Sequence, residues 1–224
     1  MTAVPMDRLL RVQLRIWLAQ RGVVIGAVLA LALGLAVVAL GSAASDEVSF
    51  SVYATVWLAI GALAGAAPFR SRWAPVVLVV APRRLRWFAT CFVSLLAIAM
   101  AVTVAFALLT AAIAASHGTV GDALTHLWQP LVAVAVDVSV GFFLGAATRA
   151  TAAALTIAYV VSPMVSLLVV GPVDVGHWLN LSAAVEVVTA ARLDGGLPTV
   201  TALFAWLVAP AVIAAWRLRH RPIR

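Results

Sequence analysis

The chain has 224 residues, of which 65% are apolar and only 10% are charged, so it is far more hydrophobic than a soluble domain. All fifteen basic residues are arginines, and without a lysine the chain has no G-x-x-x-x-G-K-[ST] loop for binding nucleotide phosphates. The composition therefore predicts an integral membrane protein without an ATPase site of its own, and the Ala-, Val- and Arg-rich content is typical of a high-GC bacterial genome.

The first segment, residues 1–22, is predicted to form an amphipathic helix. On a helical wheel Arg8, Arg11 and Arg15 cluster on one side, and apolar residues including Trp17 gather on the opposite side. Such a helix either lies in the membrane interface with its arginines toward the headgroups or acts as a positively charged anchor for the next segment. A removable signal peptide is not expected, because charges run through the whole segment.

Six further segments each contain enough apolar residues, about 20, to cross the bilayer core as a helix. They run over Val23–Leu40, Val48–Ala67, Trp87–Ala111, Trp128–Ala147, Thr151–Val170 and Val200–Trp216. The predicted fold is therefore an all-α membrane protein with six transmembrane helices, which form a single transmembrane domain over residues 1–224. An even number of spans puts both termini on one side.

Charge indicates which side that is. Fourteen of the fifteen arginines lie before the first span, between spans two and three, between spans four and five, or after span six. The opposite connections hold mainly acids. The positive-inside rule then predicts a multi-pass protein of the bacterial cell (plasma) membrane with both termini in the cytoplasm, and it explains the net charge of +7 without nucleic-acid binding.

The cytoplasmic connection over residues 68–86 contains a short apolar run between Pro75 and Pro82, which is too short to span a bilayer. One interpretation is a short helix on the membrane surface that docks into a groove on a cytoplasmic partner. The other is a helical hairpin turn whose arginines only set the topology.

Asp137 is the only acid within a predicted span, and it lies near the bilayer midplane. A carboxylate there costs several kcal/mol unless it is neutral, paired or facing a polar cavity. We predict that Asp137, with Ser139 nearby, contributes to a substrate pathway, that it binds a proton, or that it hydrogen-bonds a neighbouring helix carrying Ser162 or Ser166.

Two G-x-x-x-G spacings, Gly61 with Gly65 and Gly141 with Gly145, would allow close helix approach, although such spacings also arise by chance in a chain rich in Gly and Ala. Residues 171–199 are predicted to contain a short extracytoplasmic helix, capped by Asn180 or Ser182 and ended by the glycines and proline at 195–198. No spacing matches a metal site or a hydrolase motif, so no metal ligands and no catalytic residues are expected.

The order of these parts resembles the type 2 permease family of ATP-binding cassette (ABC) transporters. The segment Val76–Val80 is similar to that family's coupling helix, and the residues that follow it are similar to its proline and basic cluster: Ala81, Pro82, Arg83 and Arg84. The family's usual glutamate and Gly-Thr pair before this helix are replaced here by Arg70, Ser71, Arg72 and Trp73.

The resemblance implies a transport subunit that pairs with a second permease copy, as a homodimer or heterodimer, and with separate ATPase subunits that hold ATP and magnesium. It implies outward transport of a hydrophobic or amphipathic cargo such as a drug-like compound, a lipid or a peptide. The ATPase-contacting residues that it implies are Arg70, Arg72, Trp73, Val76, Val77, Leu78, Pro82, Arg83, Arg84 and Arg86.

Beyond its partner subunits the chain is expected to contact membrane lipid but no nucleic acid, and to hold no cofactor itself. Two other classes stay open. One is a secondary transporter or channel that uses Asp137, and the other is a non-transporting membrane scaffold or sensor subunit.

Overall fold

The computed structural model describes residues 6–39, 45–70, 84–116, 128–166, 175–189 and 196–220, and nearly all of these are helical, without a strand among them. The longer helices are α1 (Met6–Ala19), α2 (Arg21–Ala39), α3 (Ser45–Arg70), α5 (Arg84–Ser116) and α7 (Trp128–Thr148). The shorter ones are α8 (Thr151–Thr156), α9 (Ser162–Ser166), α10 (Val175–Leu179), α11 (Leu181–Thr189), α12 (Gly196–Leu203) and α13 (Ala209–His220). The predicted all-helical character is confirmed in these residues.

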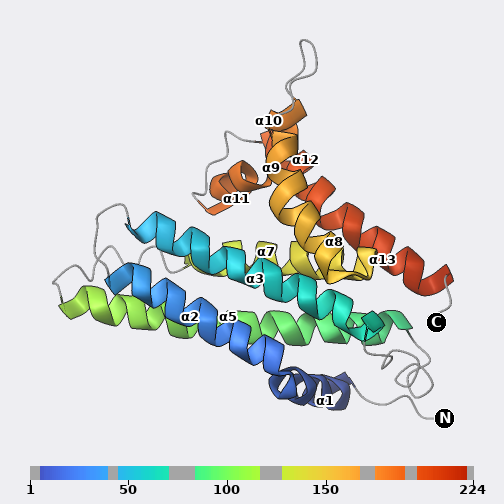
Figure 1. Cartoon of the computed structure of the whole chain (residues 1–224), viewed down its shortest axis with the longest axis horizontal. Helices are drawn as coiled ribbons and strands as arrows, with labels where there is room; N and C mark the ends of the chain where they lie inside the picture. Colours follow the sequence, from blue (N-terminus) through green and yellow to red (C-terminus); the bar gives the residue numbers. More distant parts are fainter. Residues whose placement is uncertain are drawn as a thin grey trace.

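The helices form two groups (Figure 1). In the first, α2, α3 and α5 run alongside one another, and α7 packs against both α3 and α5. In the second, the rods that contain α8 with α9 and α12 with α13 diverge from the first group and meet α10 and α11 at their far end. The helices α8, α11 and α13 of the second group also contact α7, so the two groups join along α7.

Helix length and composition support a membrane protein. Among the described residues, three helices are long and apolar enough to cross a bilayer: Arg84–Ala112, Trp128–Thr148 and Gly196–His220. A fourth span results if α1 and α2, which are bent by 68° relative to each other, are counted together. Two shorter apolar helices, Tyr53–Phe69 and Thr151–Met164, lie in the remaining predicted segments. The number of six spans therefore stays a prediction.

The tightest contact in the fold joins α3 to α7. A Cβ atom added at Gly61 or Gly65 would collide with the backbone of α7, and one added at Gly141 or Gly145 would collide with the backbone of α3. The two G-x-x-x-G pairs predicted from the sequence thus face each other. Residue numbers rise in the same direction along both contact lines, so α3 and α7 run parallel and both end on the same side of the molecule.

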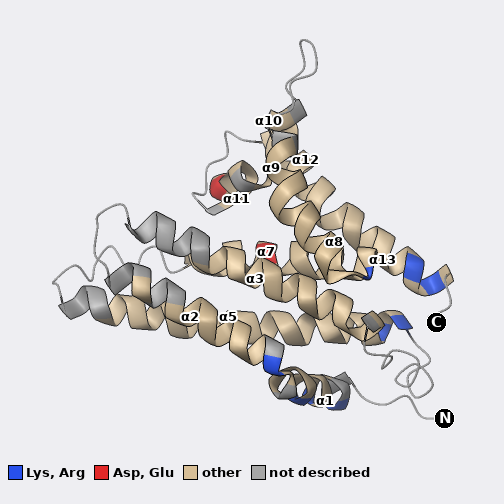
Figure 2. Cartoon of the chain, viewed as in Figure 1, with Lys and Arg blue, Asp and Glu red and all other residues tan. Residues whose placement is uncertain are grey.

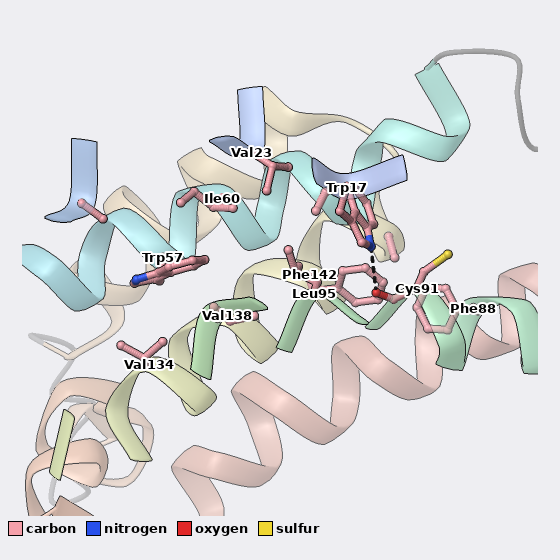
Figure 3. Close-up of a cluster of buried hydrophobic side chains, with 14 of the residues drawn as sticks. Trp17, Val23, Trp57, Ile60, Phe88, Cys91, Leu95, Val134, Val138 and Phe142 are labelled. Carbon is pink, nitrogen blue, oxygen red and sulfur yellow. Dashed lines mark hydrogen bonds between the residues drawn. The ribbon is translucent and has the colours of Figure 1, made fainter. Parts of the chain in front are cut away.

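Aromatic side chains fill the core around this pair (Figure 3). Trp17 and Trp57 are fully buried there, and Phe88 packs tilted against Phe142 with 5.1 Å between ring centroids. Tyr53 stacks on Phe106 at 4.3 Å, and its hydroxyl lies 3.1 Å from the hydroxyl of Thr103. These contacts tie α1, α3, α5 and α7 together.

Two π-helical turns interrupt the second group of helices, η1 (Ile157–Val161) between α8 and α9 and η2 (Phe204–Val208) between α12 and α13. Each ends two residues before a proline, Pro163 or Pro210. Proline lacks the N–H that would bond the carbonyl four residues earlier, and its ring clashes with that carbonyl. A widened turn that bonds five residues back relieves this conflict.

The helix α11 lies in the segment predicted to be an extracytoplasmic insertion. The amide of Ala183 donates a 3.0 Å hydrogen bond to the side-chain oxygen of Asn180, which confirms Asn180 as the cap of α11. Its predicted end stays a prediction, because α11 is described to Thr189 and residues 190–195 lie outside the described residues, whereas Gly196 begins the helix α12. Pro198 lies within the first turn of α12, where a proline is tolerated because no intrahelical acceptor is needed for its missing N–H.

We expect Gly141→Ala to destabilise the protein by about 1–3 kcal/mol, because the added methyl group would overlap the backbone at Leu58. The measurement is thermal unfolding of the purified chain in detergent, with Gly196→Ala as the matched control. A Cβ at Gly196 meets nothing within 4 Å, so its effect should stay within about 0.5 kcal/mol. Equal unfolding temperatures for the two variants would contradict the close α3–α7 contact.

Candidate functional site

Three arginines bind helix ends at one side of the bundle, here called the basic end: Arg84, Arg149 and Arg217. Arg84 at the start of α5 donates to the carbonyl of Leu218 over 3.2 Å, and Arg149 donates to the carbonyl of Arg217 over 3.4 Å. Arg217 in turn donates to the carbonyl of Ala147 in α7. Cations are favourable at helix C-termini, because the last carbonyls lack intrahelical partners.

Arg149 has a second role in the backbone. Its φ of 59° is in the left-handed region, which glycine favours, and it ends α7 before α8 begins. Its guanidinium lies 5.0 Å from the centroid of the Phe69 ring near the end of α3. Arg149 therefore connects the ends of α3, α7 and α13.

The helix α1 docks on α5 through a buried tryptophan (Figure 3). The indole N–H of Trp17 lies 2.9 Å from the hydroxyl of Ser94 and 3.3 Å from the carbonyl of Cys91. On the opposite side of α1 the arginines at 8, 11 and 15 are exposed. The predicted amphipathic pattern is confirmed, and its apolar side contacts α5. Figure 2 shows the described arginines in α1, at the start of α2 and α5, and near the end of α13.

Most of the residues implied to contact an ATPase lie outside the described residues: Arg72, Trp73, Val76, Val77, Leu78, Pro82 and Arg83. Arg70 is the last residue of α3, and Arg84 and Arg86 are half-buried in the first turn of α5. The helices on either side of residues 71–83 thus have these ends at the basic end, beside Arg149 and Arg217.

A second polar position lies in the middle of α7. Asp137 is partly buried there, and it interacts electrostatically with Tyr159 of η1. The Tyr159 hydroxyl donates to the carbonyl of Thr55 in α3 over 2.5 Å. No hydrogen-bond donor or ion-pair partner of Asp137 is found among the residues that the structure describes. The buried residue Ser162 makes no hydrogen bond with Asp137, and the side chain of Ser166 is outside the described part.

Ser139 points away from Asp137. Two positions along an α-helix correspond to about 200° of rotation, so the side chains leave α7 on nearly opposite sides. The buried Ser139 hydroxyl donates to the carbonyl of Ala135 over 2.5 Å within the same helix. Asp137 is instead close to Tyr159, which sequence reasoning missed, because a tyrosine 22 positions away in an apolar run carries no separate signal.

Comparison of the chain with family models, with curated proteins and with solved structures gives no match.

Replacing Arg149 tests its backbone role. We expect Arg149→Ala and Arg149→Gly both to lower the unfolding temperature, because each removes the contacts with Phe69 and Arg217. Glycine should be the more stable of the two by about 1 kcal/mol, since it adopts a positive φ without a Cβ clash. If alanine is tolerated as well as glycine, the left-handed conformation does not constrain this position.

The chemical reactivity of Cys91 reports on the docking of α1. Cys91 is only 1% exposed beneath Trp17, so we expect it to resist N-ethylmaleimide in the folded protein. Trp17→Ala should raise its labelling rate at least tenfold, measured as the mass shift of the intact chain. Leu18→Ala is the control, because the neighbouring Leu18 side chain is 61% exposed and its removal should leave the rate unchanged.

Proposed function

We propose that the chain is the membrane-spanning subunit of an ATP-driven exporter of the ABC type 2 permease kind. It would pair with a second permease copy and with two separate ATPase subunits, and it would move a hydrophobic or amphipathic cargo outward. Cargo transport would take place through the helices, and ATP and magnesium would bind only to the partner subunits.

The basic end is the observation that carries this proposal. Residues 71–83 connect the last residue of α3 to the first of α5, and that first residue, Arg84, is bonded to α13. A cytoplasmic partner that moved this connection would therefore act on three helices together. The docked α1 adds a further contact to α5, with its arginines exposed on the outer side.

The close α3–α7 contact supports transmission of such a movement. Two helices whose backbones touch cannot slide independently without opening voids or creating clashes. A displacement at the end of α3 would thus carry α7 with it, and α7 holds Asp137. ATP-driven closure of the partners would in this way reach the middle of the membrane-spanning part.

Capture of the ATPase tests the proposal. The tagged chain is purified from its native host in mild detergent and its partners are identified by mass spectrometry. We expect the wild type to capture an ATPase that contains a P-loop, and Leu78→Glu to reduce its yield at least tenfold. A buried contact with an apolar groove does not tolerate an unpaired carboxylate.

The matched control is Leu197→Glu, the same substitution at the start of α12, where Leu197 is 70% exposed. It should capture the ATPase as well as the wild type does. If the folded wild-type chain captures no ATPase under conditions that preserve complexes, the exporter proposal fails. A stand-alone transporter that uses Asp137 would then be favoured, because this carboxylate has no donor among the described residues.

A further inference from the structure

Asp137 lies one turn before Gly141, on the side of α7 that contacts α3 at Leu58. Tyr159 of η1 reaches the neighbouring turn of α3 at Thr55. When ionised, the Asp137 carboxylate can only accept hydrogen bonds, and the phenol of Tyr159, with which it interacts electrostatically, already donates its hydrogen bond to the carbonyl of Thr55. The remaining lone pairs of the phenol oxygen and of the carboxylate oxygens can accept further hydrogen bonds. Three elements, α3, α7 and η1, thus bring together oxygen atoms without supplying a donor from the described residues.

No cation of this chain reaches the same point from the described residues. Arg149 is twelve residues from Asp137 in α7, about 18 Å along the helix axis. It is held at the basic end by Phe69 and Arg217. The chain contains no lysine. A partly buried carboxylate with acceptors around it is stabilised best by a charged donor from outside, and an ammonium group supplies three N–H donors.

Apolar side chains continue from this point along η1 and α9. Tyr159 is 39% exposed, Val160 is 48% exposed, and Met164, one further turn along, is 65% exposed. The ring of Tyr159 offers an aromatic face to a cation, and the residues beyond it offer contact to a hydrocarbon chain. The arrangement has a polar part in the middle of the bundle and an apolar part at its surface.

We propose that Asp137 and Tyr159 bind the ammonium group of a cationic amphipathic cargo, whose hydrocarbon part lies along Val160 and Met164. This inference rests on the proposed export function and narrows its cargo to amphiphiles that carry a primary amine. The carboxylate forms the ion pair, and the phenol oxygen accepts a second hydrogen bond from the same group.

The test measures binding of radiolabelled dodecylamine to the full chain in phosphatidylcholine nanodiscs, with empty nanodiscs subtracted. Dodecanol, which has the same chain length without the charge, is the matched probe. We expect saturable binding of dodecylamine only. Asp137→Asn should weaken it at least tenfold, Asp137→Glu should retain most of it, and Tyr159→Phe should weaken it several-fold.

Thr110→Val in α5 is the control for removing a hydroxyl, because the Thr110 hydroxyl donates to the carbonyl of Ala107 within its own helix. We expect this variant to bind the amine normally. Protection of Cys91 from N-ethylmaleimide verifies folding. If Asp137→Asn does not fold, Tyr159→Phe, which keeps the carboxylate, decides the question. The proposal is overturned if Tyr159→Phe, or a folded Asp137→Asn, binds the amine as tightly as the wild type does. It is also overturned if dodecanol binds as tightly as the amine.

No ATPase is present in this measurement. A chain that captures its ATPase but binds no amine therefore overturns the cargo inference alone. A chain that binds the amine but captures no ATPase instead overturns the exporter proposal and leaves the site standing.

Discussion

The close crossing of α3 and α7 fixes the position of both candidate sites. Burial of apolar side chains gives little gain in lipid, so helices associate there through close packing of small residues and through hydrogen bonds. Glycines on both helices permit backbone contact, and the parallel direction brings both helix ends to the basic end. One turn before Gly141, the same contact line places Asp137 beside the turn of α3 that carries Thr55, because Gly141 itself faces Leu58.

Pro163 determines where Tyr159 lies relative to Asp137. Pro163 cannot bond the carbonyl four residues before it, which belongs to Tyr159, and the chain widens into η1 at this point. Tyr159 thus lies in the widened turn, from which its hydroxyl reaches α3. The same spacing before Pro210 gives η2, so the two π-helical turns have one local cause.

Much of the fold follows from patterns within single segments. Hydropathy predicted the apolar helices, and the wheel of α1 predicted which side carries its arginines. Gly196 and Pro198 are typical helix terminators, yet the structure places both in the first turn of α12, a position that glycine and proline also fit. Contacts between segments were harder to predict. Each glycine pair indicated that another helix approaches closely, but the sequence did not indicate that the α3 pair contacts the α7 pair. Asp137 stood out as an isolated charge, whereas Tyr159 acquires its role only from the packing of η1 against α7.

Among the described helices, α7 is the one that joins the two sites, since it carries Asp137 in its middle and ends at Arg149. Because α7 is in close backbone contact with α3, these two helices would move together, and a displacement at the basic end would shift Asp137 and Thr55 together. Tyr159 follows a different path, because the left-handed Arg149 separates α7 from α8 and η1 lies beyond it. Movement of η1 relative to α7 would separate the phenol from the carboxylate and leave the glycine contact intact. Such a movement would break the hydrogen bond from Tyr159 to Thr55 and change the geometry around Asp137, so that the proposed site would bind a cation in one state and release it in another.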